Sequence, residues 1–340
     1  MHTAFRHTSP SRTTYELGCL RFVVGTSAMD RNLRIVARSL LLDREAARAV
    51  EHLRVQGVPS ILLKGRTIAT WLYDDGEIRP YVDVDLFVPP ARFRTAIEEL
   101  SELGYRPRLL GAHPSELGRK ELDLIGPAEV CIDLHHGLLG AAAPSDRVWE
   151  VLQQHTVTLS LGAGQEVTAL DVPARAMHLA LHAAQNGPLD VKAVIDLERG
   201  LAKVSRSDWE RAAVLADQIG ATEAFAAGLR LLPAGEILAE QLSLTRRMSV
   251  ELALRVRSAP QDALFFERFS EAYGIRGKTA LVARKVVPTS ASLRANSEVA
   301  ARGSMGLVLA RMSHPLSLAI RLGPAFVAWY RTRQAVRAMR

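Results

Sequence analysis

The sequence predicts an α/β (α+β) fold, in which a core with a mixed sheet precedes a C-terminal helical domain. Between residues 58 and 170, short apolar runs with β-branched members alternate with segments of helix-like composition, and from Pro173 onward the period becomes helical. The chain has 340 residues, of which 48% are hydrophobic and 23% charged. This balance is that of an ordinary globular protein with room for two modest cores, and it excludes a disordered chain.

The expected helices and strands of the first half follow from the spacing of apolar residues and from the glycine and proline residues that end each element. A helix from Leu33 ends at Gly57, because Pro59 blocks its continuation. The later elements are a strand over 58–63, a helix over 66–73, a strand around residues 83–88, a helix over 90–104, a hairpin of 122–125 with 130–134, and a second hairpin over 157–170.

The second half is expected to be helical to about residue 285. Ser207 to Glu210 has the form of a capping box that starts a helix. Alanine-rich helices are expected over 222–232 and 250–256. The predicted organisation is a flexible N-terminal arm at 1–30, in which Met29 is an alternative start, a catalytic domain at 31–172, a helical domain at 173–285, and a basic tail with short helices at 286–340.

Two carboxylates on one strand are the most informative feature. Successive side chains of a strand point to opposite faces, so Asp83 and Asp85 project together while Val82, Val84 and Leu86 face the interior. Two like charges this close raise a pKa unless a cation lies between them. Mg²⁺ prefers such oxygens and completes its shell with water and phosphates. Asp133, in a later alternating run, is a third candidate ligand.

The turn before this strand has the composition of a phosphate site. Gly65 lets the backbone approach a ligand, and N–H groups at the start of the next helix can receive phosphate oxygens. Lys64 and Arg66 add positive charge, and Thr67 adds a hydroxyl. Together with the carboxylates, the turn indicates phosphate chemistry.

These motifs resemble the DNA polymerase β-like nucleotidyltransferase superfamily, and within it a group of uncharacterised bacterial nucleotidyltransferases. The matching motifs, over roughly residues 35 to 200, are Leu63-Lys64-Gly65, Arg79, Asp83-Val84-Asp85-Leu86-Phe87-Val88, Leu103-Gly104-Tyr105 and Ile132-Asp133-Leu134-His135. In the wider superfamily the first turn is usually Gly-Ser, where this chain has Gly65-Arg66.

The resemblance implies a minimal nucleotidyltransferase core that moves an NMP group from an NTP, most simply ATP, with release of pyrophosphate. It implies that Asp83 and Asp85 hold two Mg²⁺ ions, and that Asp133 holds the catalytic ion and helps to activate the acceptor hydroxyl. Lys64 is then a triphosphate contact, and Arg79 orients the carboxylates or meets phosphate. The acceptor stays open among a small molecule, a glycan, a peptide, a protein and RNA.

A histidine pair follows in the helical region. His178 and His182 are four residues apart and share a helix face, so zinc binding with His135 or His136 is one interpretation and a structural or substrate-facing role the other. His135, His182, Lys192 and Asp196 are possible substrate residues. The spacing of Lys192 and Asp196 also fits a plain helix salt bridge.

Each motif also has a purely structural interpretation. An Asp-x-Asp pair at a strand end often serves a turn or cap. Asp133 and His135 fit a satisfied polar strand end, and Lys64 fits a solvated lysine. Two other functions are also compatible with the motifs, namely a toxin-like transferase acting on tRNA and a non-catalytic nucleotide-binding protein that kept the fold.

Charge and cysteine content limit which partners and which cellular compartment are expected. Residues 275–340 contain twelve Lys or Arg and one acid, Glu298, so the net charge of this tail is about +11. The net charge of the whole chain is +7, so the remainder carries about −4. The interleaved apolar and basic residues of the tail fit an anionic membrane surface, a nucleic-acid backbone or a solvated tail. The two cysteines, Cys19 and Cys131, imply no disulfide framework, and no signal peptide is recognisable, so a cytoplasmic protein is expected.

Overall fold

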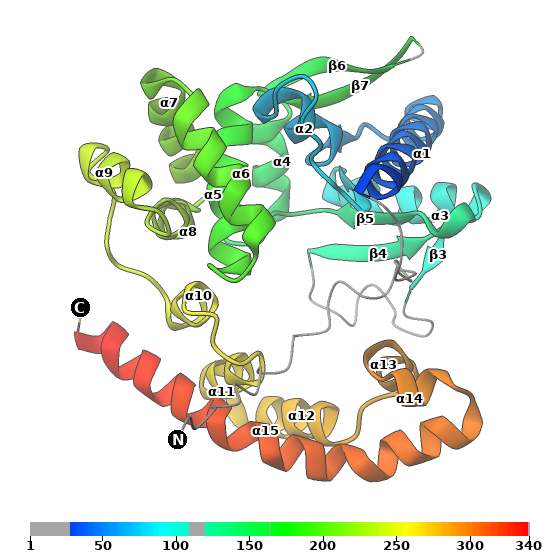
Figure 1. Ribbon diagram of the computed structural model, residues 1–340. Coiled ribbons are helices and arrows are strands. Elements are labelled where there is room, and N and C mark those ends of the chain that lie inside the picture. Colours follow the sequence, from blue (N-terminus) through cyan, green and yellow to red (C-terminus); the bar gives the residue numbers. More distant parts are fainter. Residues whose placement is uncertain (1–27, 109–119, 163, 339–340) are drawn as a thin grey trace, which may run out of the picture.

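The computed structural model describes residues 28–108, 120–162 and 164–338. Figure 1 shows a sheet with helices packed on it, followed along the chain by a helical region that ends in one long helix. The sheet has the order β3-β4-β5-β2-β1-β7-β6. Its strands are β1 (Ile61–Leu62), β2 (Asp83–Phe87), β3 (Arg106–Pro107), β4 (Glu121–Ile125), β5 (Cys131–His135), β6 (Thr156–Gly162) and β7 (Gln165–Leu170). The predicted α/β fold with a mixed sheet and a C-terminal helical region is confirmed.

Parallel and antiparallel pairs alternate across the centre of the sheet. β2 is antiparallel to β1 and parallel to β5, and β4 is antiparallel to β5. The register places Asp85 beside Asp133, and Asp133 beside Asp123. Because side chains at paired positions share a face, three carboxylates lie in one row across β2, β5 and β4.

Each face of the sheet is covered by its own apolar cluster. Val84 and Leu86 of β2 pack with α1 (Ala28–Val55) and α3 (Phe93–Glu102). Phe87, on the face of Asp83 and Asp85, packs with α4 (Ser145–Leu152) and α5 (Val172–Asn186). Val82 is 39% exposed, so its expected interior position was wrong; β2 begins only at Asp83.

Helices dominate the chain after residue 171. Short α2 (Arg66–Leu72) lies earlier, between β1 and β2. The later helices are α6 (Val191–Lys203), α7 (Arg206–Gln218), α8 (Thr222–Leu229), α9 (Pro233–Gln241), α10 (Val250–Val256), α11 (Asp262–Glu271), α12 (Gly274–Val286), α13 (Ser290–Asn296), α14 (Glu298–Ala301) and α15 (Ser304–Ala338). None of the helices in the described residues is long and apolar enough to cross a membrane.

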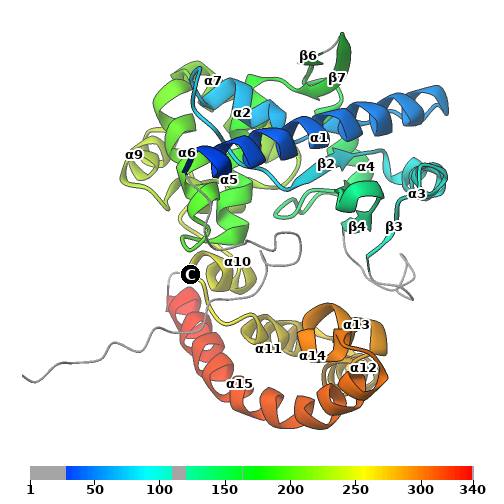
Figure 2. The same ribbon diagram turned by 45° about the vertical axis from the view of Figure 1, so that its right-hand side comes forward.

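The two ends of the chain differ from expectation. α1 begins at Ala28, so residues 28–30 belong to a helix, and the remainder of the expected flexible arm, residues 1–27, lies outside the described residues. The expected short helices of the tail are only partly right, because α15 alone spans 35 residues. Pro315 and Pro324 suggest breaks in the sequence, yet both are accommodated inside α15, which is visibly curved (Figure 2).

The start of α7 corrects the expected capping box. Ser205, not Ser207, is the N-cap, and its Oγ accepts a hydrogen bond from the backbone N–H of Asp208 at 3.1 Å. The Ser205 hydroxyl in turn donates to the carboxylate of Asp208 at 2.6 Å. Asp208 thus takes the role that the sequence interpretation gave to Glu210, and Glu210 instead pairs with Arg206 at the surface.

This cap predicts a difference between two neighbouring serines. Ser205→Ala removes the acceptor for a first-turn N–H and should lower the free energy of unfolding by about 1 kcal/mol. Ser207→Ala should change it by less than about 0.5 kcal/mol. Urea unfolding followed by circular dichroism measures both, and equal losses would contradict the assignment of the cap.

Candidate functional site

Four carboxylates gather on the face of the sheet that α5 covers. Asp85, Asp133 and Asp123 form the row across three strands, and Asp83 lies two residues before Asp85 on the same face. Asp85 is only 1% exposed. So many acids in a buried place require compensating cations, because an unpaired buried charge is costly.

Lys64 and His135 supply that compensation at Asp85. The ammonium nitrogen of Lys64 lies 2.7 Å from Asp85 Oδ1, and His135 Nε2 lies 3.2 Å from the same oxygen. His135 Nδ1 is also 3.6 Å from a carboxylate oxygen of Glu121. The turn after β1 and the end of β5 therefore bring a lysine and an imidazole to the most buried acid of the row.

The pKa directions follow from this distribution of charge. Burial alone raises the pKa of Asp85, but Lys64 and His135 outweigh it and hold that pKa below its usual range. Burial, Asp85 and Asp83 raise the pKa of Asp133 to about 9. Burial and Asp85 also raise the pKa of Asp83. Lys64 therefore keeps one carboxylate ionised, while its neighbours are under electrostatic pressure to hold protons.

Asp123 belongs to this row but was not predicted from the sequence. The hairpin of 122–125 with 130–134 was expected, and the register of the observed pair puts Asp123 opposite Asp133. The signal was present, because Glu121-Leu122-Asp123-Leu124-Ile125 alternates acidic and apolar residues. Extending the hairpin register to its side chains would have identified this fourth acid.

The turn residues after β1 separate into two groups. Lys64 faces the carboxylates, and Gly65 has a φ of 71°, which a residue with a Cβ rarely adopts. Arg66 instead lies 3.7 Å from Asp43 of α1, on the opposite side of the sheet. Thr67 is fully buried and donates its hydroxyl to the carbonyl of Leu63 at 3.1 Å. In this structure the hydroxyl serves the helix backbone, and its expected contact with phosphate stays a prediction.

Arg79 forms a buried ion pair with Asp196 of α6. Its Nε and Nη2 donate to the two carboxylate oxygens of Asp196 at 2.8 and 2.5 Å, and both side chains are 2% exposed. The hydroxyl of Tyr73 donates to the same carboxylate at 2.8 Å. This pair ties the segment before β2 to α6, and the expected role of Arg79 at the carboxylates or a phosphate stays a prediction.

α6 holds the same segment at two further points. Arg199 donates to both carboxylate oxygens of Glu77 at 2.6 and 2.8 Å, and Lys203 lies 2.5 Å from Asp74. The expected helix salt bridge between Lys192 and Asp196 was wrong, because the buried acid pairs with Arg79. Lys192 instead lies close enough to Asp83 to lower its pKa, so it faces the site.

The histidine pair of α5 also faces the site. Burial and the charge of Lys64 lower the pKa of His178 to about 3 and that of His182 well below its usual value. The two rings are 6.4 Å apart between centroids. In the described part of the chain they form no tight ligand group with His135 or His136, so the zinc interpretation is not supported. Both shifts disfavour the charged imidazole, and His182 Nε2 lies 3.1 Å from the side-chain amide nitrogen of Asn186.

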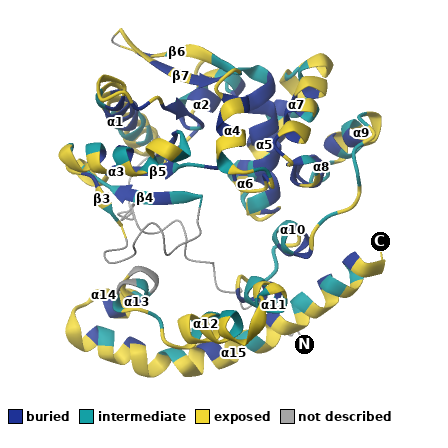
Figure 3. Cartoon of the chain, turned by 180° about the vertical axis from the view of Figure 1, so that it is seen from behind, coloured by how far each residue is buried: buried dark blue, intermediate teal, exposed yellow. Residues whose placement is uncertain are grey.

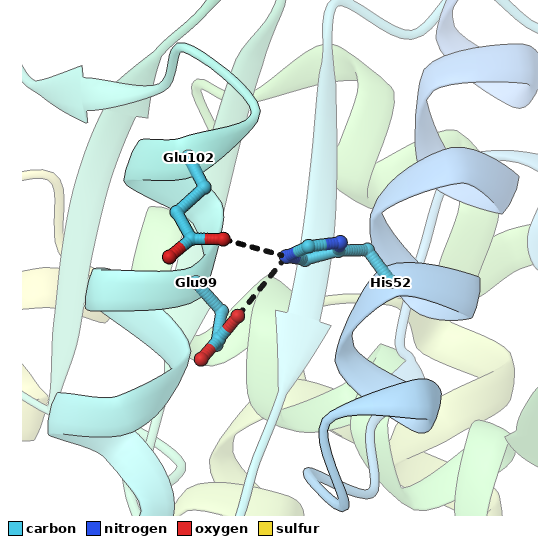
Figure 4. Close-up of side chains that lie close together, drawn as sticks. All are labelled: His52, Glu99 and Glu102. Atoms are coloured by element: carbon cyan, nitrogen blue, oxygen red, sulfur yellow. Dashed lines mark hydrogen bonds and ion pairs between the residues drawn. The ribbon is translucent and has the colours of Figure 1, made fainter.

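A separate His-Glu-Glu group lies on the α1 side of the sheet (Figure 4). Among the described residues it is the one set of three His, Cys, Asp or Glu side chains whose ligand atoms lie within 4.8 Å of one another. Asp83, Asp85 and Asp133 do not gather that closely. His52 Nε2 is 3.1 Å from Glu99 and 4.0 Å from Glu102. This hydrogen bond satisfies the imidazole and joins α1 to α3. A hollow of about 660 Å³ lies beside His52, and Asp83, Asp85 and Asp133 are not among the residues that line it.

The part of the chain that contains the acids, the Lys64 turn and α6 is similar in sequence to known proteins. A family described as uncharacterised nucleotidyltransferase matches residues 27–234. No curated protein matches the chain. Among solved structures, the antibiotic-resistance factor ANT(2'')-Ia in solution matches with 17% identity and a TM-score of 0.37, over 55% of this chain and 95% of that chain.

Two further solved structures are similar. ANT(2'')-Ia with adenylyl-2''-tobramycin matches with 16% identity and a TM-score of 0.35, over 55% of this chain and 98% of that chain. The Thermotoga maritima CCA-adding enzyme, complexed with tRNA, matches with 12% identity and a TM-score of 0.23, over 89% of this chain and 86% of that chain. The family match, which includes the carboxylate row, the Lys64 turn and α6, carries more weight than these likenesses.

The buried Arg79–Asp196 pair predicts a large cost for removing one partner. Asp196→Ala leaves a buried guanidinium unpaired and should lower the free energy of unfolding by about 3 kcal/mol. Glu210→Ala removes a surface ion pair with Arg206 and should cost less than about 1 kcal/mol. Urea unfolding of both variants tests the difference. The double variant Arg79→Leu with Asp196→Leu should recover part of the loss, and similar losses for the two alanine variants would contradict the role of the pair.

The raised pKa of Asp133 predicts a pH-dependent stabilisation by asparagine. Between pH 4 and about 9 the folded protein holds a proton at Asp133 that the unfolded chain releases, so this group's contribution to stability falls as pH rises. Asp133→Asn stays neutral, and in EDTA it should melt higher than wild type at pH 8, by roughly 2 to 4 °C per kcal/mol gained. The gain should vanish towards pH 4.

Thermal unfolding between pH 4 and 9 measures this effect. Asp75→Asn, at an exposed position, is the matched control and should follow wild type at every pH. A difference between Asp133→Asn and wild type that does not change with pH would refute the assignment.

Proposed function

The chain belongs to the uncharacterised nucleotidyltransferase family, and from that membership we propose that it transfers an NMP group from an NTP to a hydroxyl of an acceptor, with release of pyrophosphate. Asp83, Asp85 and Asp133 are the proposed catalytic carboxylates. The observation that carries the proposal is the row of acids beside Lys64, in which Asp85 is buried and the others are half-buried, on a sheet face covered by α5.

The donor set fits Mg²⁺. The acids offer hard oxygen ligands from adjacent strands, and the raised pKa values of Asp83 and Asp133 reflect the negative charge that accumulates there. A divalent cation relieves this repulsion and would be held by Asp83, Asp85 and Asp133. When bound, it supplies neutralisation of charge on the phosphate oxygens of the nucleotide.

The side chains of this chain then have distinct tasks. In the transfer, a bond forms between the acceptor oxygen and the α-phosphorus, and the bond from that phosphorus to pyrophosphate breaks. The proton of the acceptor hydroxyl would pass to Asp133, whose carboxylate is ionised when a bound cation offsets its raised pKa. Lys64, which pairs with Asp85, and Lys192, whose charge lowers the pKa of Asp83, are the proposed contacts for the triphosphate. ATP is the proposed donor.

Residues outside the carboxylate row have positioning roles in this proposal. Gly65 gives the turn its positive φ and lets Lys64 reach Asp85. Arg79 and Asp196 hold the segment that enters β2, so that Asp83 and Asp85 keep their place relative to α6. His135 orients Asp85, and neutral His182 is a candidate hydrogen-bonding group for the acceptor.

Removal of one carboxylate should abolish transfer. Purified protein is incubated with each α-³²P-labelled NTP, Mg²⁺ and cell extract separated into protein, RNA and small-molecule fractions. We expect label in one fraction with wild type and at least a 100-fold loss with Asp83→Asn, because preorganised electrostatic groups contribute at least this much. The labelled fraction identifies the acceptor class.

Glu150→Gln is the matched control, since this exposed acid of α4 pairs only with Arg147 in a surface ion pair. It should retain full activity. Transfer that persists in Asp83→Asn would place the reaction elsewhere. Nucleotide binding with neither label transfer nor pyrophosphate release would favour a binding protein that kept the fold.

A further inference from the structure

α15 has apolar side chains on two opposite faces. Its inward face is buried through small and aliphatic residues, among them Ala310, Leu318, Ala325 and Val336. These pack on α10, α11, α13 and α14. The exposed apolar side chains, which we call the outer stripe, are 45% to 74% exposed and are Met305, Val308, Leu309, Met312, Leu316, Ile320, Phe326, Val327 and Tyr330.

The outer stripe follows the helical period. With 3.6 residues per turn, its nine members fall within an arc of about 120°, and the buried residues fall within the opposite arc. A helix on the surface of a soluble protein normally turns polar residues to this outer side. A helix of 35 residues spans about 50 Å, so the stripe is one continuous apolar surface rather than scattered exposed residues.

The stripe lies at an edge of the molecule. In Figures 1 and 2, α15 runs along the side away from the sheet, with α11 to α14 between it and the rest of the protein. The outer side of α15 is largely exposed in Figure 3. The helix is bowed with its convex side outward (Figure 2), so a flat partner meets the middle of the outer stripe first.

The charges beside the stripe are positive. α15 contains five arginines and no acidic residue. Arg331 and Arg337 are exposed. Arg321 and Arg333 instead lie near Asp262 and Glu267 of α11, and Arg311 donates a hydrogen bond to Ser290. Across residues 275–340 there are twelve basic residues and one acid. An apolar stripe on a helix rich in arginine is the composition of a helix that lies in the interface of an anionic membrane.

We propose that α15 docks on the surface of a membrane that contains anionic lipids. The outer stripe enters the boundary between headgroups and acyl chains, and the exposed Arg331 and Arg337 meet lipid phosphates. A second copy of this chain fits poorly, because two such strongly positive surfaces repel each other. A nucleic acid also fits poorly, because seven of the nine members of the stripe are Met, Val, Leu or Ile, which neither pair with phosphates nor stack on bases.

Vesicle flotation of the full-length protein tests this proposal. We expect binding to vesicles of 70% phosphatidylcholine and 30% phosphatidylglycerol, and at least tenfold weaker binding to phosphatidylcholine alone. The double variant Leu316→Glu with Ile320→Glu, at the centre of the stripe, should lose binding at least tenfold. Arg331→Gln with Arg337→Gln should weaken binding and reduce its dependence on salt.

Val214→Glu with Ile237→Glu is the matched control, since these residues are 56% and 58% exposed on α7 and α9. It should bind vesicles like wild type. Circular dichroism confirms that each variant is folded. The test is independent of the proposed reaction, because flotation needs no turnover.

Three results would overturn the proposal. One is that neither kind of vesicle binds the wild type. Another is a dimer in analytical ultracentrifugation that the stripe variant dissociates, with no vesicle binding, which would assign the stripe to a second copy. The third is salt-sensitive RNA binding that competes fully with vesicles and survives the stripe variant, which would assign the surface to nucleic acid through its arginines alone.

Discussion

The negative charge that gathers on one face of β2, β5 and β4 is the constraint on which the rest of the site depends. Asp85, Asp133 and Asp123 are neighbours by strand register, so their side chains cannot separate without loss of the sheet. Lys64 pairs directly with Asp85, and its charge does not outweigh burial and the neighbouring acids at Asp83 and Asp133, whose pKa values stay raised. A rigid scaffold thus holds an arrangement that is unfavourable without cations, which is how binding sites for divalent ions are commonly made.

The helical region maintains this arrangement from the other side. Asp196 of α6 binds Arg79, four residues before Asp83, and Arg199 binds Glu77 in the same segment. A buried ion pair contributes little net stability when compared with apolar residues, but its fixed geometry defines one position for the chain. The entry to β2 is therefore located by α6, and the two halves of the family match form one functional unit.

Local patterns were predictable from the sequence, and long-range partners were not. The alternation in residues 83–88 and the Lys64-Gly65 turn identified β2 and the turn before it, and Pro173 marked the change to helices. The partner of Arg79 lies 117 residues later, and no local rule indicates it. Asp123 was accessible through hairpin register. The continuous α15 was not, because tertiary packing overrides the two prolines that suggest breaks.

The neutral histidines of α5 follow from the same electrostatics. His178 and His182 lie near Lys64 and are buried, and both effects disfavour an imidazolium. A protonated imidazole here would add positive charge beside the place where a divalent ion is proposed to bind, and the two would repel each other. Neutral rings avoid this repulsion and still offer a donor and an acceptor to a ligand. The helix that covers the carboxylates therefore supplies hydrogen-bonding groups without competing for the negative charge that the strands provide.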